Sequence, residues 1–275
     1  MEKAEKTKKS WQERKTQIKY KWAMPFIFVE WFCERMSYLL SRWAFIEILQ
    51  YAGQLAIILA LISYAKGCTQ REMQAENQRK AKHYQAWQVI NTAQGKTGSG
   101  GRIDALQDLN SDGISLVGVD VSKAWLPSVN LENANLYLAN FAGATLDKAD
   151  LSAANLLSAD LSHAALVEAN LAGASLVWAK LNEANLPNAN LSGADFHEAD
   201  LSFARLDGAN LKGIKNWKNI RSLSYVAIEG VKNAPDGFVK LARQQGAYEK
   251  QIKDHQKWLE FIREKKKELE ARTSK

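Results

Sequence analysis

The sequence predicts a repeat architecture at residues 114–213, with apolar helical segments before it and basic helices after it. An apolar residue stands at every fifth position from Leu116 to Leu211 without exception. A small apolar residue precedes each of them by two places, and it is alanine at every step from Ala134 to Ala209. A period of five fits neither the α-helix, which repeats about every 3.6 residues, nor the strand, which alternates. The repeat therefore predicts an architecture of its own.

Asn or Asp mostly separates the alanine from the leucine, in units such as ADLSA, ANLLS and ANLYL. This A-[DN]-L-x-x pattern resembles the pentapeptide-repeat proteins, over about 100 of the 275 residues and in 20 consecutive registers. The resemblance implies a mainly β fold, a right-handed quadrilateral β-helix of about five coils in which four units make one square coil. It also implies that the leucine and the small residue point into the lumen while the other three positions point outward.

The chemistry of the residues agrees with this implied fold. Two inward side chains separated by one outward residue make the alternation of a short strand. The other two positions turn a corner, where Asn and Asp can hydrogen-bond to the local backbone. Each coil stabilises only its neighbours, so both ends need caps. We expect an N-terminal cap at 102–113, with Ile103, Leu106 and Leu109 on one helical face, and a second cap at 214–232.

The chain before the repeats divides into four predicted segments. Residues 1–21 hold eight Lys or Arg and are expected to form a disordered basic arm. Residues 22–66 form the membrane region: 22–42 are expected at the membrane interface, with a buried aromatic helix as the alternative, and 43–65 form a transmembrane helix. The span Trp43–Ala65 is predicted from its length and from the absence of formal charge after Glu47. Residues 67–101 follow as a helix and a glycine-rich joint, whose GKTGSGG order does not match a phosphate-binding loop.

Basic residues flank the predicted span on both sides, so the positive-inside rule does not give a single orientation. A single pass and a helical hairpin with residues 22–40 as its first arm both remain open. We expect a bacterial inner membrane, with the repeat domain on its cytoplasmic side.

Charge is segregated along the chain: the net charge is +6 over residues 1–113, −6 over 114–213 and +7 over 214–275. Residues 214–275 are expected to form the C-terminal cap and then basic helices. The cluster Arg263, Lys265, Lys266 and Lys267 suits either anionic lipid or an ordinary solvated helix face. With two cysteines, Cys33 and Cys68, the chain is neither a disulfide scaffold nor a zinc cluster.

Residues for catalysis are missing from the sequence. No His, Cys and carboxylate groups have metal-ligand spacing, and no nucleophile elbow or dinucleotide fingerprint is present. Asp120, Asp160 and Asp200 share a column, but the aspartates lie two coils apart and are better explained as corner residues than as an acid and a base. We therefore predict no enzyme, no cofactor and no metal.

Alignment in steps of 20 residues gathers large apolar residues on one outer face. One corner position collects Val117, Tyr137, Leu157, Val177 and His197, and the next collects Gly118, Leu138, Ser158, Trp178 and Glu198. Another face, which we call the flat face, is flat and small in comparison: it carries Glu132, Ser152, Ala172, Ser192 and Lys212, with Asn133, Ala153, Gly173, Gly193 and Gly213 next to them. Clustered exposed aromatics usually mark an interaction surface. The predicted partner-binding residues are Tyr137, Leu138, Leu157, Val177 and Trp178, unless residues 69–94 or the C-terminal helix cover them.

These observations predict a non-catalytic, membrane-anchored scaffold whose rod binds another protein. The alternative comes from the resemblance, because some pentapeptide-repeat proteins are acidic DNA mimics that protect topoisomerases, and the rod is acidic. A third interpretation is self-association through the rod ends or the helix at 248–272. The sequence does not name the partner, and nucleic acid is not expected to be one.

Overall fold

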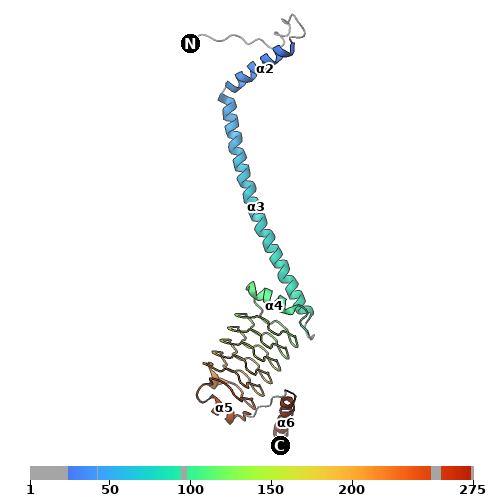
Figure 1. Cartoon of the computed structure of the whole chain (residues 1–275), viewed down its shortest axis with the longest axis vertical. Helices are drawn as coiled ribbons and strands as arrows, with labels where there is room; N and C mark the ends of the chain where they lie inside the picture. Colours follow the sequence, from blue (N-terminus) through green and yellow to red (C-terminus); the bar gives the residue numbers. More distant parts are fainter. Residues whose placement is uncertain (1–23, 42, 94–97, 249–254, 274–275) are drawn as a thin grey trace. The chain divides into compact units, whose positions relative to one another are not determined.

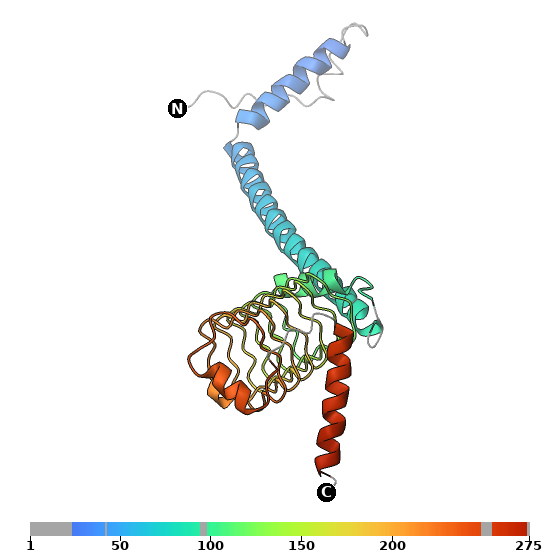
Figure 2. The same ribbon diagram turned by 60° about the horizontal axis from the view of Figure 1, so that its bottom comes forward.

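The protein is described here by a computed structural model that covers residues 24–41, 43–93, 98–248 and 255–273. The predicted basic arm at 1–21 lies outside these residues. The chain divides into two compact units, Met1–Asn77 and Gln78–Lys275, and each is considered by itself. Figures 1 and 2 show the helices of the first unit and the coiled repeat of the second.

The first unit contains α2 (Met24–Ser41) and most of α3 (Trp43–Thr92), a helix of 50 residues. No proline falls between Pro25 and Pro127, so nothing in α3 removes a backbone donor or breaks the helix. The apolar part of α3 reaches a mean hydropathy of 1.6 over 18 residues, and none of that stretch is buried against the protein. By length and composition this helix can cross a membrane.

The second unit is a solenoid of square coils, as expected from the repeat. Parallel bridges join residues 20 positions apart, as in Asp120 with Asn140 and Asn140 with Asp160. In each pentapeptide the backbone N–H at the alanine position donates to the carbonyl of the preceding leucine position, for example from Ala144 to Phe141 at 2.9 Å. Each coil therefore has four corners, and the pentapeptide leaves only a short extended stretch between them. For this reason the described residues form isolated bridges rather than strands of several residues.

The third residue of each corner turn has a positive φ, which is typical of a type II turn. Gly173 and Gly193 occupy this position with φ of 70° and 71°, but most corners carry a residue with a side chain, such as Ala153 with φ of 54°. A side chain in this left-handed region strains the backbone, and Asn is among the residues that tolerate it best. The repeat therefore stores a small strain at many corners.

The lumen holds the leucine and alanine positions, as the resemblance implied. From Leu116 to Leu211 the leucine position is at most 2% exposed, and Phe141 and Phe196 fill it in place of leucine. Outside the lumen, Asn and Asp side chains accept hydrogen bonds from the backbone two residues on, as Asp120 does from Ser122 N–H at 3.0 Å. Amide side chains also form a ladder between coils, in which Asn190 bonds to Asn170 and Asn210 bonds to Asn190. The corner chemistry predicted for Asn and Asp is confirmed.

Both ends of the solenoid are covered by helices. At the start, α4 (Arg102–Ser111) buries Leu106 and Leu109 on the first coil, and the end of α3 adds Ile90 to the same core. At the other end, α5 (Phe238–Gln244) buries Phe238 against the last coil. Figure 1 shows α4 and α5 at opposite ends of the coils.

The coils continue beyond residue 213. Bridges from Asp200 to Ser222 and from Asn210 to Lys232 step by 22 residues, because the 3-10 turn η2 (Trp217–Asn219) adds two residues at one corner. Leu223 and Val226 continue the buried lumen at 0% exposure. Residues 214–232, expected as a cap, thus form a further coil, and α5 provides the cover.

Candidate functional site

The predicted apolar residues do share one side of the solenoid, which we call the Tyr137 face. It consists of the segments 115–120, 135–140, 155–160, 175–180 and 195–200. Backbone bonds hold these segments in register: Leu138 N–H donates to the Leu157 carbonyl at 3.0 Å, and Trp178 N–H donates to the His197 carbonyl at 2.9 Å. Neighbouring coils are spaced about 4.8 Å apart, so outward side chains at the same corner form a column.

Large apolar side chains of the Tyr137 face lie in the open. Val117, Tyr137, Leu138 and Trp178 are 46%, 38%, 51% and 50% exposed, while Leu157 and Val177 are half-buried between them. Soluble proteins seldom keep such a cluster in water without a use for it. Because the residues stand on hydrogen-bonded coils, the surface they form is rigid.

Leu138 and Trp178 occupy the strained corner position, with φ of 58° and 56°. A residue with a bulky side chain seldom adopts this conformation, and such outliers gather where a function requires them. The local sequence would form the same corner more easily with Gly or Asn.

The Tyr137 face is rimmed by acidic residues. Its segments carry five carboxylates and one lysine: Asp120, Asp160, Asp195, Glu198, Asp200 and Lys180. Burial acts to raise the pKa of Asp160, but the hydrogen bonds from Ser162 and the charge of Lys180 outweigh it, so this pKa lies below its ordinary value. Asp160 and Lys180 pair at 3.4 Å. The three aspartates of the column lie on the bridged stretches and accept hydrogen bonds from the backbone of the corner that follows, at Ser122, Ser162 and Ser202.

The chain's own C-terminal helix, α6 (His255–Thr273), packs on the next corner of the square. Phe203 and Tyr225 stack there with ring centroids 5.3 Å apart, and Trp258 and Ile262 of α6 cover them. Figure 2 shows α6 alongside the coils. Neither α6 nor the part of α3 in this unit buries Tyr137, Leu138 or Trp178 among the described residues.

A buried ion pair lies beneath α6. Arg205 Nε donates to Asp207 Oδ2 at 3.0 Å, and both side chains are 7% exposed. The guanidinium of Arg205 lies 5.9 Å from the Trp258 ring centroid. The pattern of alanine and leucine gives no signal for this pair, although Phe203 and Arg205 stand out as a bulky and a charged residue at outward positions.

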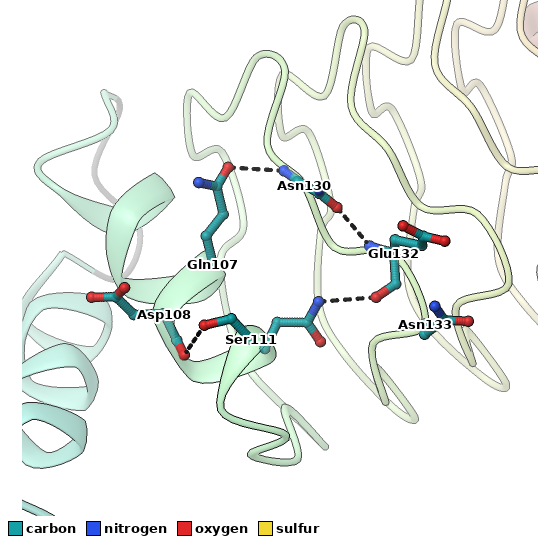
Figure 3. Close-up of a pocket in the computed structure, with 7 residues that line it drawn as sticks. Gln107, Asp108, Ser111, Asn130, Glu132 and Asn133 are labelled. Carbon is teal, nitrogen blue, oxygen red and sulfur yellow. Dashed lines mark hydrogen bonds between the residues drawn. The ribbon is translucent and has the colours of Figure 1, made fainter. Parts of the chain in front are cut away.

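A polar pocket lies between α4 and the first coils, lined by Gln107, Asp108, Asn110, Ser111, Asn130, Glu132 and Asn133. Figure 3 shows two contacts between α4 and the first coil in this pocket, one from Gln107 to Asn130 and one to Glu132. Gln107 Oε1 accepts from Asn130 N–H at 2.9 Å, and Asn110 Nδ2 donates to the Glu132 carbonyl at 3.0 Å. These bonds satisfy the open edge of the first coil, so the pocket is explained by capping.

The end of α3 is tied to the same cap by charged groups. Lys82 pairs with Asp108 at 3.1 Å, and His83 Nε2 lies 2.7 Å from Asp112 Oδ2. The hydrogen bond with His83 lowers the pKa of Asp112. Arg102 is 1% exposed and donates to the carbonyls of Ala93, Gly98 and Ser99, which fixes residues 98–101 against the cap.

Within the described ranges, no group of three or more His, Cys, Asp or Glu could hold a metal ion. His163 lies 3.5 Å from Glu183 and His83 lies beside Asp112, each as a single pair.

A family model described as pentapeptide repeats matches residues 114–152, 134–173 and 174–213, with eight copies. The chain belongs to the pentapeptide-repeat family. The membership rests on the repeat domain, which the family model matches from residue 114 to residue 213. Among curated proteins, none matches the chain in sequence.

Solved structures of other pentapeptide-repeat proteins are similar to the repeat domain. HetL, involved in heterocyst differentiation regulation in the cyanobacterium Nostoc sp. strain PCC 7120, is 28% identical over 41% of this chain and 59% of its own, with a TM-score of 0.26. A pentapeptide-repeat protein of the Arabidopsis thaliana thylakoid lumen is 34% identical over 36% and 66%, with a TM-score of 0.20. QnrB1, a plasmid-mediated fluoroquinolone resistance protein, is 17% identical over 44% and 71%, with a TM-score of 0.32. The chain thus spans 59% of the length of HetL.

Proposed function

We propose that this protein is a non-catalytic, membrane-anchored scaffold that binds a partner protein through the Tyr137 face. The exposed apolar column on that face is the observation that carries the proposal. Tyr137, Leu138 and Trp178 together expose an aromatic, aliphatic and indole surface on a rigid support. Aromatic anchors surrounded by polar residues are the usual centre of a protein interface.

The membrane anchor is proposed from α3. Its apolar stretch meets the length and hydropathy expected of a span, and side chains such as Ile57 and Leu61 are 63% and 62% exposed. The aromatic residues of α2, including Phe26 at 74% exposure, suit a helix that lies at the membrane interface.

Reporter fusions after residues 21 and 275 test the anchor and its orientation. The proposal expects membrane fractionation of the full chain, with the C-terminal reporter active in the cytoplasm. Replacement of Leu55, Ile58 and Leu61 with aspartate should release the chain into the soluble fraction, because charges at the centre of a span are costly. A wild-type chain that fractionates as soluble would remove the anchor from the proposal.

Substitution of the Tyr137 face tests the scaffold role. Aspartate at Tyr137, Leu157 and Trp178 should abolish recovery of co-purifying proteins after cross-linking. The matched control places aspartate at Ser152 and Ala172, which hold the position of Tyr137 and Leu157 on the flat face, and at Ala153, which holds the position of Trp178. Both variants add three charges to the rod, so only a specific surface distinguishes them. An unchanged set of partners in the first variant would refute the assignment of this face.

A further inference from the structure

Bulky side chains at strained corners follow a pattern. Among the described residues with positive φ other than glycine, four are large and apolar or aromatic: Leu138, Trp178, Phe203 and Tyr225. The remaining corners carry small, polar or charged residues. Since each bulky residue strains its turn, each needs a compensating contact or a function.

Phe203 and Tyr225 show what the compensating contact is. Their stacked rings form a platform for α6, and Phe203 is only 8% exposed beneath it. Trp258 and Ile262 of α6 are 1% and 3% exposed in the same cluster. The bulky corner residues of this solenoid therefore bind the apolar side of a helix.

A lysine of α6 completes this contact. Lys266 Nζ bonds to Glu183, which stands in the same corner column one coil before Phe203. The same ammonium group lies 5.7 Å from the centroid of the Phe203 ring. The contact thus combines an apolar stripe with a cation placed over an aromatic and a carboxylate.

Leu138 and Trp178 are the bulky residues of the adjacent corner, two coils apart with Ser158 between them, and they stay 51% and 50% exposed. Glu198 follows Trp178 by one coil in the same column, and it pairs with Arg221 at 3.5 Å in a solvent-exposed contact. An exposed ion pair of this kind contributes little and can be exchanged for another cation. This corner thus offers an aromatic, an aliphatic and a carboxylate side chain, where the α6 site offers two aromatics and a carboxylate.

The spacing of the column also suits a helix. Val117 and Val177 lie three coils apart, which is about 14 Å at roughly 4.8 Å per coil. One turn of an α-helix rises about 5.4 Å, so residues at i, i+3 or i+4, and i+7 meet successive coils. The face carries five carboxylates against Lys180 and the Arg221 that pairs with Glu198, and the remaining negative charge favours a positively charged helix over a second copy of this acidic rod.

We propose that the Tyr137 face binds a positively charged, amphipathic α-helix of a partner protein, in the manner in which the neighbouring corner binds α6. This inference rests on the proposed function, because it names the kind of partner that the face accepts. It assigns Leu138 and Trp178 to the apolar side of that helix and Glu198 to one of its lysines or arginines.

The test uses a fluorescent peptide with the sequence of residues 255–273 as a model basic helix, titrated onto the full chain in detergent. We expect saturable binding that weakens at least about tenfold in the Leu138→Gly/Trp178→Gly variant. Glycine relaxes both corners, so this variant keeps its fold. The matched control, Asn133→Gly/Ala153→Gly, changes two corners of the flat face and should leave the affinity unchanged.

Charge variants separate the proposed site from the α6 site. Glu198→Lys should weaken peptide binding, while Glu183→Lys should not. If binding depends on Glu183 alone, the peptide has displaced α6 and the inference is wrong. The inference is also wrong if the peptide does not bind, or if light scattering shows a dimer that Leu138→Gly/Trp178→Gly dissolves.

The two proposals fail in different ways. If aspartate at Tyr137, Leu157 and Trp178 removes co-purifying proteins but the peptide does not bind, the face binds a protein that is not a basic helix. Only the further inference then falls. If the partners persist and the peptide does not bind, both proposals fall.

Discussion

Replacing Ala153 with glycine is expected to make the protein more stable, although glycine usually makes a protein less stable than alanine does. Ala153 is exposed and has φ of 54°, so its methyl group buries little while its backbone is strained. A non-glycine residue in this region costs about 1–2 kcal/mol. Relief of this strain by glycine is partly offset, by about 0.4–1 kcal/mol, because glycine has more conformational freedom in the unfolded chain. Ala153→Gly should therefore stabilise the protein by about 0.5–1 kcal/mol.

Gly173 offers the reciprocal experiment one coil away in the same column. Its φ is 70°, and a Cβ atom added there would meet no atom within 4 Å. Gly173→Ala therefore tests backbone strain without a steric clash, and it should destabilise the protein by about 0.5–1 kcal/mol.

Urea unfolding of the full chain in detergent, followed by circular dichroism, should move the midpoint up for Ala153→Gly and down for Gly173→Ala. The slope should stay constant in both variants, because the buried area hardly changes. A lower midpoint for Ala153→Gly would refute the claim of corner strain. It would also weaken the argument made from Leu138 and Trp178.

Three further predictions concern the lumen and the attached helices. Leu161→Ala removes a side chain that is 0% exposed and leaves a cavity. The free energy of unfolding, measured in urea, should therefore fall by about 3–5 kcal/mol. Trp258→Ala removes the main apolar anchor of α6, which is 1% exposed, and limited proteolysis should then release residues 255–273 faster than in Lys257→Ala. The lowered pKa of Asp112 stabilises the folded cap above the ordinary carboxyl pKa of about 3.9, and this contribution is lost as the pH falls through the folded value. Protection of residues 78–92 against hydrogen exchange, taken relative to the intrinsic rate at each pH, should accordingly fall below the ordinary carboxyl pKa of about 3.9, and Asp112→Asn should remove that pH dependence.

The controls for these predictions lie in the same chain. A substitution at an outward position, such as Ser192→Ala, should leave the urea midpoint unchanged, in contrast to Leu161→Ala. Equal proteolysis of Trp258→Ala and Lys257→Ala would contradict the packing of α6. Protection that stays constant as the pH falls below the ordinary carboxyl pKa of about 3.9, down to acid unfolding, would contradict the role given to His83 and Asp112.

The lumen could be predicted from the sequence because its chemistry repeats with the structure. Each inward position in a coil meets the same surroundings, so Leu116 and Leu211 obey one rule. The Tyr137 face could also be located, because residues 20 apart share a corner and Tyr137, Leu157 and Val177 are apolar where most corners are not. Whether own-chain helices cover that face depends on contacts between distant segments, which a periodic pattern does not encode.

Other contacts lie outside what periodicity can predict. The last coil, of 22 residues, could not be predicted from the repeat. The turn η2 shifts the register, so Leu223 and Val226 no longer follow the five-residue step. Arg102 is an unremarkable basic residue in the sequence, yet it is buried and organises the loop before α4. The docking of α6 joins Phe203 to Trp258 across 55 positions, and only the folded chain brings them together.

Site-specific photo-cross-linking tests the central claim most directly. A photoreactive phenylalanine in place of Leu157 on the Tyr137 face is compared with the same residue in place of Ala172 on the flat face, in the full chain in cells. We predict a discrete cross-linked partner from position 157 and none from position 172, with a basic amphipathic helix at the site of attachment. Equal cross-linking from the two positions, or none from position 157, would contradict the proposal that this face binds a protein.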